Sequence, residues 1–398
     1  MPAFIPYGAW WSTPFAKWQG SLSRLDTLQL AAASGLRALE RPGMPETLRE
    51  RVDLGILGIT NPQPGSFYGL PYVTGLMGLA SVAGPTIQQA CATSARALQM
   101  AAQEVAAGTA RCALLVMADR QSNGPLVHYP DPGAPGGYGR TERWVLDNMA
   151  RDPFAGNAML ETGENVARRY GISTAEQHAV KLHRHAQYQA ALADDRAFQR
   201  RYMVDVALER GGVLSADEGV FPTTEAGLAR LKPVRADGTI TFGGQTHPAD
   251  GNAGMIVTGR DDARRLAREP GVEVELLGFG MARAEAGYMP MAPIPAAQRA
   301  LAAAGVAIAQ VDALKTHNPF AVNDIALARD TGFAWERMNN FGSSLVWGHP
   351  QAPTGLRAVI ELIEELALRG GGIGLFTGCA AGDSAVALVL RVGDARRA

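Results

Sequence analysis

The sequence predicts an α/β fold built from two similar halves, with a long segment inserted between them. Short apolar runs that suit buried strands alternate with helical runs, for example residues 52–59 and then 93–107. A similar order of features recurs in the second half, which indicates a duplicated unit. Residues 120–245 interrupt this alternation and begin with a stretch rich in Gly and Pro. We therefore expect a first half over 1–119, completed by about 246–268, an inserted loop domain over 120–245, and a second half over 269–398.

The internal repeat rests on spacing rather than on sequence identity. The triplet Arg-Ala-Leu at residues 37–39 recurs at 299–301, and a Val-Asp pair follows each copy. Counted from the Val of that pair, Cys91 lies 39 residues further on and His349 lies 38 residues further on, and both precede a helical run. Duplication would place the two residues at equivalent corners between sheet and helix, facing each other. Chance agreement of the spacings is the alternative.

Local patterns predict the individual elements. Apolar residues at helical spacing predict a helix over 28–39, and Gly108 is a suitable C-cap for the helix that follows Cys91. Residues 112–117 form an apolar run typical of a buried strand in a parallel sheet. A helical stretch is expected over 162–192. Further expected elements are a charged helical turn over 261–268 and strands over 313–315, 373–376 and 385–392.

The bulk composition is that of a soluble globular protein with a sizeable core. The chain has 398 residues, of which 47% are hydrophobic and 19% charged, and its net charge is −1. No basic field favours nucleic acid or an anionic membrane surface, and no apolar run is long enough to span a bilayer. The N-terminus lacks the pattern of a secretory signal, and three cysteines give no disulfide framework. We expect a cytoplasmic protein with no nucleic-acid or membrane partner.

Cys91 lies between an apolar run and the alanine-rich helical run over 95–107. A cysteine at such a strand-to-helix turn lies beside the free N–H groups and the positive end of the helix dipole, which stabilise a thiolate and lower its pKa. The position is analogous to the exposed nucleophile turn of hydrolases, with sulfur in place of oxygen. A buried structural cysteine, as we expect for Cys112, is the alternative.

Three further stretches place reactive side chains at strand ends: His317, His349 and Cys379. Strand ends gather into one site in α/β sheets. A histidine can take the proton of a thiol, a second cysteine can move a proton at a carbon acid, and Gly-rich turns can donate N–H groups to a thioester oxyanion. A loop histidine and a core cysteine are the alternatives. The one close histidine pair, His183 and His185, points to different sides of a helix, so we predict no metal site.

With these stretches identified, the chain resembles the thiolase family, that is, the acetyl-CoA acetyltransferases and 3-ketoacyl-CoA thiolases, nearly from end to end. Gly348-His349-Pro350 with Thr354-Gly355 and Arg357 resembles GHPxGxTGxR, the most specific of the family motifs. The other matches are Ser12-Thr13-Pro14-Phe15 with RTPxGxxxG, Cys91-Ala92-Thr93-Ser94 with CGSG or CASG, Met159, Thr162, Glu164 and Asn165 with MGxTAEN, and Thr377-Gly378-Cys379-Ala380-Ala381-Gly382 with CxGGG.

The resemblance implies a layered α-β-α-β-α sandwich and acyl transfer between coenzyme A thioesters. Cys91 would become acylated, His349 would activate it, and Cys379 would be the acid/base at the α-carbon of the substrate. His317 stands where the sterol-carrier-protein type of thiolase carries His in HDxF, and it would form one oxyanion hole with His349. The backbone N–H groups of Cys91 and Ala381 would form the second hole.

The resemblance also implies substrate contacts and partners. Thr246 stands where a serine commonly meets the pantetheine of coenzyme A, and Met159 and Phe320 are further substrate-binding candidates. Trp144 and Met149 could line the acyl pocket or belong to the core. Coenzyme A is expected as a substrate and not as a permanently bound cofactor. A homodimer or homotetramer is expected, because thiolases pair through the edge of the N-terminal half.

Two other functions remain open from the sequence. Decarboxylating ketoacyl synthases share the fold and use a cysteine with two histidines, but Cys379 argues against them because they need no second cysteine. A thiolase-like subunit that is active only with a small zinc-containing OB-fold partner is the other alternative. It is kept open by the altered loop 245–248 and by the unusual residues 318–320 after His317.

Overall fold

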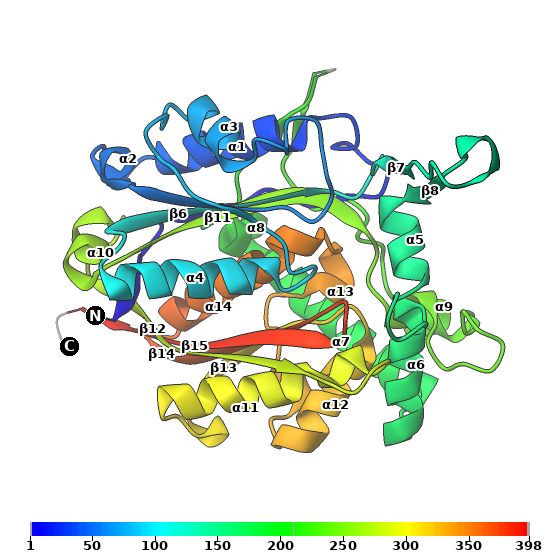
Figure 1. Ribbon diagram of the computed structural model, residues 1–398. Coiled ribbons are helices and arrows are strands. Elements are labelled where there is room, and N and C mark those ends of the chain that lie inside the picture. The colour runs from blue at the N-terminus through cyan, green and yellow to red at the C-terminus, as the bar shows by residue number, and fades with distance from the viewer. Residues whose placement is uncertain (1, 210, 396–398) are drawn as a thin grey trace.

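The computed structural model describes residues 2–209 and 211–395. Figure 1 shows five layers, in which two sheets enclose a pair of central helices and further helices cover the outer face of each sheet. The layered α/β sandwich expected from the sequence is confirmed. From top to bottom in Figure 1 the helical layers are α1 (Thr27–Leu39), α2 (Leu48–Arg51) and α3 (Leu70–Leu76), then α4 (Thr93–Ala107) and α14 (Gln351–Leu368), then α11 (Pro293–Ala304) and α12 (Ala321–Thr331).

The two sheets share one topological unit, as the spacing of the repeat predicts. In the upper sheet β4 (Leu54–Gly58) and β6 (Cys112–Arg120) are parallel, and α4 lies between them in the chain. In the lower sheet β13 (Ala313–His317) and β14 (Gly372–Ala380) are parallel, and α14 lies between them. The other strands are β2 (Trp10–Ser12), β3 (Ala16–Lys17), β5 (Thr86–Ile87) and β11 (Ala249–Thr258) above, and β12 (Val272–Arg283) and β15 (Ser384–Asp394) below.

The N-terminal strand β1 (Ala3–Pro6) joins the two sheets. It pairs antiparallel with β12 along its whole length, so that Phe4 lies opposite Glu275, and Phe4 also pairs with Thr258 of β11. The hydrogen-bonded path of strands therefore continues from one layer into the other at β1.

Each interface between layers has its own apolar core. The central one packs side chains of α4 and α14, such as Leu98 and Ile360, against Leu115 of the upper sheet and Leu388 of the lower sheet. Two further cores lie under the outer helices. Because α14 is buried over 351–366, its charged side chains lie inside the protein and need partners there.

These partners form a cluster of buried ion pairs around α14. Arg357 binds both carboxylate oxygens of Asp217, at 2.6 and 2.8 Å, and its Nε lies 3.1 Å from Glu361. Glu361 in turn accepts from the Lys315 ammonium at 2.7 Å, and all four side chains are at most 1% exposed. The Arg357 guanidinium also lies 4.4 Å from the ring centre of Trp347. The cluster thus joins α14 to β13 and to the inserted segment.

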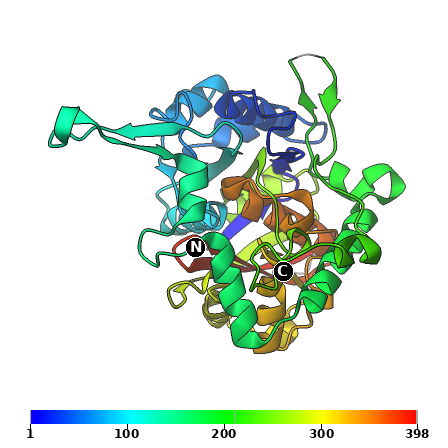
Figure 2. The same ribbon diagram turned by 90° about the vertical axis from the view of Figure 1, so that its right-hand side faces the viewer.

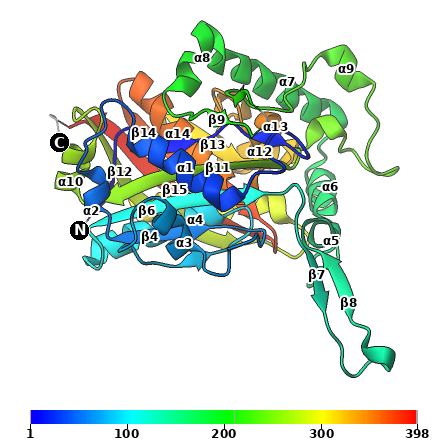
Figure 3. The ribbon, with the colours of Figure 1, turned by 90° about the horizontal axis from the view of Figure 1, so that it is seen from above.

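Much of the inserted segment lies outside the layers. Figures 2 and 3 show the hairpin of β7 (Leu126–Tyr129) and β8 (Arg140–Arg143) projecting from the body. The α-helices and the other strands of the segment are α5 (Trp144–Ala150), α6 (Met159–Tyr170), α7 (Thr174–Ala191), α8 (Ala193–Arg200), β9 (Val206–Ala207), β10 (Val213–Leu214) and α9 (Glu225–Ala229). The proposed domain boundaries stay a prediction.

The helical stretch expected over 162–192 consists of two helices, α6 and α7, with a break at residues 171–173. Gly171 ends α6 in the left-handed conformation, with a φ of 62°. Ser173 and Glu176 then form a capping box that starts α7. The charged turn over 261–268 is α10 (Arg260–Leu266). None of the helices in the described residues has both the length and the apolar character that crossing a bilayer requires.

Asp217→Ala should destabilise the fold strongly. The substitution leaves the buried Arg357 guanidinium without its bidentate partner, and breaking a buried pair in this way typically costs about 3–5 kcal/mol. Urea unfolding followed by circular dichroism measures the loss. Glu40→Ala, which breaks the exposed pair with Arg49, is the matched control and should change the free energy of unfolding by less than about 1 kcal/mol. Equal effects of the two substitutions would contradict the role given to the buried cluster.

Candidate active site

Four reactive side chains from both halves meet between the two sheets. Cys91 precedes α4, His317 ends β13, His349 precedes α14, and Cys379 lies in β14. The Cys91 sulfur and one ring nitrogen of each of the two histidines lie within 4.8 Å of one another, and the two rings stack with their centres 4.0 Å apart. Cys379 is near enough to Cys91 that a charge on Cys91 raises its pKa. The structure therefore brings together all four residues that the sequence singled out.

The turn that presents Cys91 is held in an unusual conformation. Ala90 has a φ of 42°, a backbone angle that residues other than glycine rarely adopt. The Thr93 hydroxyl fixes the turn, because it accepts from the Gln89 N–H at 2.8 Å and donates to the Ala90 carbonyl at 2.6 Å. Helix α4 begins at Thr93, as the strand-turn-helix pattern predicts.

The expectation of a lowered pKa at Cys91 is wrong. Burial of the thiol raises its pKa to about 12, and the carboxylate of Asp119 adds to this. The backbone N–H of Ala381 donates to the sulfur and acts in the opposite direction, with a smaller effect than burial. At neutral pH the resting residue is therefore a thiol, and it needs a base before it can react.

His349 has the position and the protonation state that such a base needs. Its Nδ1 lies 2.8 Å from the Thr354 hydroxyl, which donates to the Pro350 carbonyl at 2.5 Å, so Nδ1 carries the proton. Nε2 then presents a lone pair, and it has no partner among the described residues. Burial, together with His317 and His247, holds the pKa of His349 well below its usual range. The ring is a neutral acceptor beside a protonated thiol.

Asn323 fixes Cys379, and no pattern in the sequence indicated this residue. Its Oδ1 accepts from the backbone N–H of Phe320 at 3.2 Å, which orients Nδ2 toward the Cys379 sulfur at 3.4 Å. Burial raises the pKa of Cys379 above its usual range, so this thiol too is protonated at rest. Asn323 lies in α12, on the turn that follows the His317 strand.

Asp119 fixes the start of α14 and was also missed as a site residue. It is the last residue but one of β6 and accepts from the Ala352 N–H at 2.6 Å, and its other contacts include the Thr60 hydroxyl at 2.7 Å. Burial raises its pKa to about 6. The contact ties the His349 turn to the sheet that carries Cys91. The rule that strand ends gather at a site would have found it, because Asp119 directly follows the apolar residues 112–118 of this strand.

A cavity of about 450 Å³ opens onto Cys91 and His349. Thr246, Met159 and Phe320, the predicted substrate contacts, line it together with Cys91 and His349. Of the two loop-domain candidates, Met149 lines the cavity, whereas Trp144 is tied through Nε1 to the Thr60 carbonyl at 2.9 Å. The remaining lining residues are Trp18, Gln121, Val145, Leu146, Gln245, Pro248, Met289, Pro319 and Gln351.

A second cavity of about 440 Å³ adjoins the first. The two share Gln245 and Thr246, and the second is also lined by Lys181, Phe221 and His247. The His247 carbonyl accepts from the His349 N–H at 2.9 Å, so the altered loop 245–248 helps to hold the reactive turn. A ligand that reaches Cys91 through both cavities would pass between residues of this loop.

Comparisons with known proteins cover almost the whole chain. Two family models match it, "Thiolase, N-terminal domain" over residues 10–261 and "Thiolase, C-terminal domain" over 272–392. An acetyl-CoA acetyltransferase of Pseudomonas aeruginosa is 29% identical over 95% of this chain and 96% of its own length. A 3-ketoacyl-CoA thiolase of Bacillus subtilis is 27% identical over 96% and 97%. The crystal structure of the Bacillus anthracis acetyl-CoA acetyltransferase has a TM-score of 0.89 at 25% identity and 98% coverage of both chains.

Titration should show a protonated Cys91 at neutral pH. Because its pKa is raised, the thiolate should be absent near pH 7 and appear only as the pH approaches about 12. The ultraviolet absorbance of thiolate in the wild type, minus that of Cys91→Ser, measures this residue alone. A thiolate signal at neutral pH that disappears in Cys91→Ser would show instead a resting ion pair with His349.

Proposed function

The chain belongs to the thiolase family, and we propose that it transfers acyl groups between coenzyme A thioesters through an acyl-enzyme at Cys91. The observation that carries this assignment is the meeting of two thiols and two neutral histidines beside a cavity that Cys91 and His349 line. A single thiol with one base would serve simple acyl transfer. The second thiol, Cys379, adds a group that can move a proton at carbon.

Formation of the acyl-enzyme begins with one proton transfer. The Cys91 proton moves to Nε2 of His349, and the sulfur attacks the 3-keto carbon of a 3-ketoacyl-CoA. The protonated Nε2 and the backbone N–H groups of Cys91 and Ala381 are the donors available to oxyanions in the site. The bond between C2 and C3 breaks, its electron pair stays on C2, and Cys379 gives C2 its thiol proton. Acetyl-CoA, or another acyl-CoA, leaves.

The second half-reaction returns every group to its resting state. The thiol of an incoming coenzyme A gives its proton to the Cys379 thiolate and attacks the acyl group on Cys91. Cys91 leaves as a thiolate and recovers its proton from His349. Condensation follows the same steps in reverse. Coenzyme A is thus a substrate, and we propose that it approaches through the cavity that Thr246 and His247 line.

The alternatives raised from the sequence are not favoured. The matches to both thiolase domains and to acetyl-CoA acetyltransferase and 3-ketoacyl-CoA thiolase relatives support the thiolase reaction over a decarboxylating synthase. The Asn323 contact that positions Cys379 agrees with a chemical role for this second cysteine. If the purified chain cleaves a 3-ketoacyl-CoA without any other protein, no partner subunit is required.

We propose that the acyl group is uncharged. Among the described residues, the cavity at Cys91 has no Asp, Glu, Lys or Arg in its lining, and Leu146, Met149, Met159 and Met289 give it an apolar wall. A carboxylate on the acyl chain would lose its water there without gaining a cation, which is costly. Flexible Met side chains adapt to acyl chains of different shape.

We further propose a cytoplasmic homodimer or homotetramer. All three cysteines are free thiols, which suits a reducing compartment. The outermost strand of the upper sheet is β5, close to Cys91 in the chain, and its edge is available for pairing with a second copy. Light scattering that gives only a monomer mass would exclude the association.

His349→Ala and Cys379→Ala should fail at different steps. Loss of the base at Cys91 should slow acylation by about 10²–10⁴. Cys379→Ala should still acylate Cys91 from a simple acyl-CoA, but should lose cleavage of a 3-ketoacyl-CoA and deuterium exchange at the α-carbon of acetyl-CoA. Single-turnover acylation and deuterium uptake measure the two steps.

Cys91→Ser lacks the proposed nucleophile and is the negative control for acylation. Mass spectrometry of peptides then locates the acyl group on the wild type. Label on Cys112 or Cys379 but not on Cys91 would refute the proposed nucleophile. Exchange at the wild-type rate in Cys379→Ala would make that cysteine structural.

Substrates of equal length with a methyl or a carboxylate terminus should differ strongly. We expect kcat/KM to be roughly 100-fold or more lower for the carboxylate, since an unpaired buried charge costs several kcal/mol. Met149→Lys should reduce the difference in kcat/KM between the two substrates by supplying a cation, whereas Met149→Leu should leave this difference unchanged. A carboxylate substrate that the wild type uses equally well would refute the proposal.

A further inference from the structure

The wall of the cavity at Cys91 is not apolar on every side. Besides its apolar side chains, three glutamines from separate parts of the chain line it, namely Gln121, Gln245 and Gln351. Gln121 directly follows β6, Gln245 lies in the loop 245–248, and Gln351 is the first residue of α14. Gln121 and Gln351 are buried, with exposed fractions of 1% and 8%. The uncharged cavity therefore has side-chain amides in its wall, and an amide can both donate and accept hydrogen bonds.

Gln121 has a hydrogen-bond donor that the protein does not satisfy. Its Nε2 is buried, and among the described residues it is the one buried side-chain amide nitrogen without a partner. An amide N–H that is buried without a partner costs free energy, so such groups are normally bonded in folded proteins. The unsatisfied donor therefore points to a partner that comes from outside the chain.

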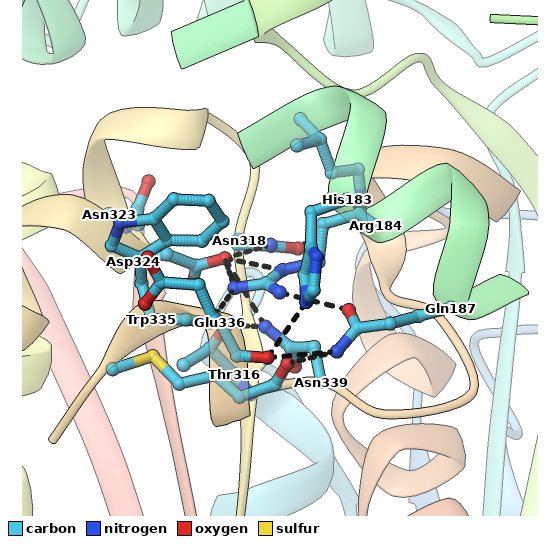
Figure 4. A network of polar contacts seen from close by, with 12 residues as sticks. His183, Arg184, Gln187, Thr316, Asn318, Asn323, Asp324, Trp335, Glu336 and Asn339 are labelled. Atoms are coloured by element: carbon cyan, nitrogen blue, oxygen red, sulfur yellow. Dashed lines mark hydrogen bonds and ion pairs between the residues drawn. The ribbon is translucent and has the colours of Figure 1, made fainter. Parts of the chain in front are cut away.

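Buried amides elsewhere in the structure are satisfied. In the polar network of Figure 4, Asn318 Nδ2 donates to Asp324 at 2.7 Å, and Asn339 Nδ2 donates to the Thr316 hydroxyl at 2.8 Å. Such bonds hold the end of β13 against α12, so these amides have a structural role. The Nε2 of Gln121 forms no bond of this kind, although the residue is as deeply buried.

The main chain, and not the amide, fixes the position of Gln121. The next residue, Ser122, donates its backbone N–H to Asp250 of β11 at 2.9 Å. Asp119, which holds the start of α14, lies two residues earlier on the chain. The fold thus places Gln121 in the cavity wall without using the hydrogen bonds of its Nε2.

We propose that Gln121 determines acyl specificity, and that the transferred acyl group carries a neutral oxygen that accepts a hydrogen bond from Gln121 Nε2. The oxygen belongs to an ether, hydroxyl or keto group further along the acyl chain than the carbonyl that Cys91 attacks. The inference rests on the proposed function and names the class of acyl group. The methionines and Leu146 in the wall surround the hydrocarbon part of the chain.

The proposal separates three kinds of acyl group by their cost in the cavity. An all-carbon chain fills the apolar part and leaves the Gln121 donor unpaired. A carboxylate can accept from this donor, but one neutral N–H does not offset the loss of water around a full charge. A neutral oxygen satisfies the donor and carries no charge into the cavity, so this class should bind best.

A series of 3-ketoacyl-CoA substrates tests the proposal, in which one ether oxygen replaces a methylene at successive positions of the chain. At one position the ether should have a kcat/KM at least about tenfold above that of the all-carbon chain of equal length. Gln121→Leu should lose this preference, because kcat/KM falls for the ether and is kept or raised for the all-carbon chain. General damage to the cavity would lower both values, so the opposite changes identify the lost hydrogen bond.

Gln103→Leu is the matched control, since it makes the same substitution at an exposed position of α4. It should leave the preference for the ether unchanged. A wild type that prefers the all-carbon chain at every oxygen position, or an ether preference that survives in Gln121→Leu, would overturn the proposal.

Binding of unreactive analogues separates this inference from the proposed reaction. In these analogues a thioether replaces the thioester of the same acyl-CoA series, so no acyl group can be transferred. Isothermal titration calorimetry should show the same preference of about tenfold in Kd in the wild type, and none in Gln121→Leu. If the preference is found but Cys91 is never acylated, the proposed reaction is wrong and the role of Gln121 stands. If Cys91 is acylated but neither measurement shows a preference, only the role of Gln121 is wrong.

Discussion

The buried pair of Lys315 and Glu361 fixes the relation between the two histidines of the site. Lys315 lies two residues before His317 on β13, and Glu361 lies on the helix that His349 precedes. Neither charge can reach water, so the strand and the helix hold each other in a single register. Arg357 extends the same cluster to Asp217 of the inserted segment. Charged residues within a central helix therefore set the geometry of groups that are themselves uncharged.

The reactive groups share one property, which is that all of them are uncharged in the resting site. Burial raises the pKa of both cysteines, lowers that of His317 to about 3, and keeps His349 neutral. An enclosed site has little water to stabilise ions, so it favours the neutral form of every group. Charges then arise when a substrate carbonyl is present to receive them. This limits reaction of the thiols with other electrophiles while the site is empty of substrate.

The sequence predicted the alternation of strands and helices and the reactive residues because each carries a local signal, whereas the layered arrangement was implied by the family resemblance. An apolar run before a Gly-rich or helical turn marks Cys91 and Cys379, and the repeat spacing relates α4 to α14. The strand end expected at His349 is wrong, because the short helix α13 (Ser344–Trp347) precedes this residue. The sequence did not predict the high pKa of Cys91, because the helix terminus is visible in sequence whereas the depth of burial is not. Asn323 was missed for a similar reason. Its importance comes from a contact across the fold, and it belongs to no recognisable pattern on its own chain segment.

The strand β1 has a consequence for the biosynthesis of the protein. Phe4 leaves the ribosome long before its partner Glu275, which lies in the strand that opens the second half. The lower sheet cannot be completed, and the two layers cannot be joined, until most of the chain has been made. Pairing over so long a sequence separation is slow, and it leaves strand edges open in the meantime. This chain therefore most needs protection by chaperones while only its N-terminal half has been made.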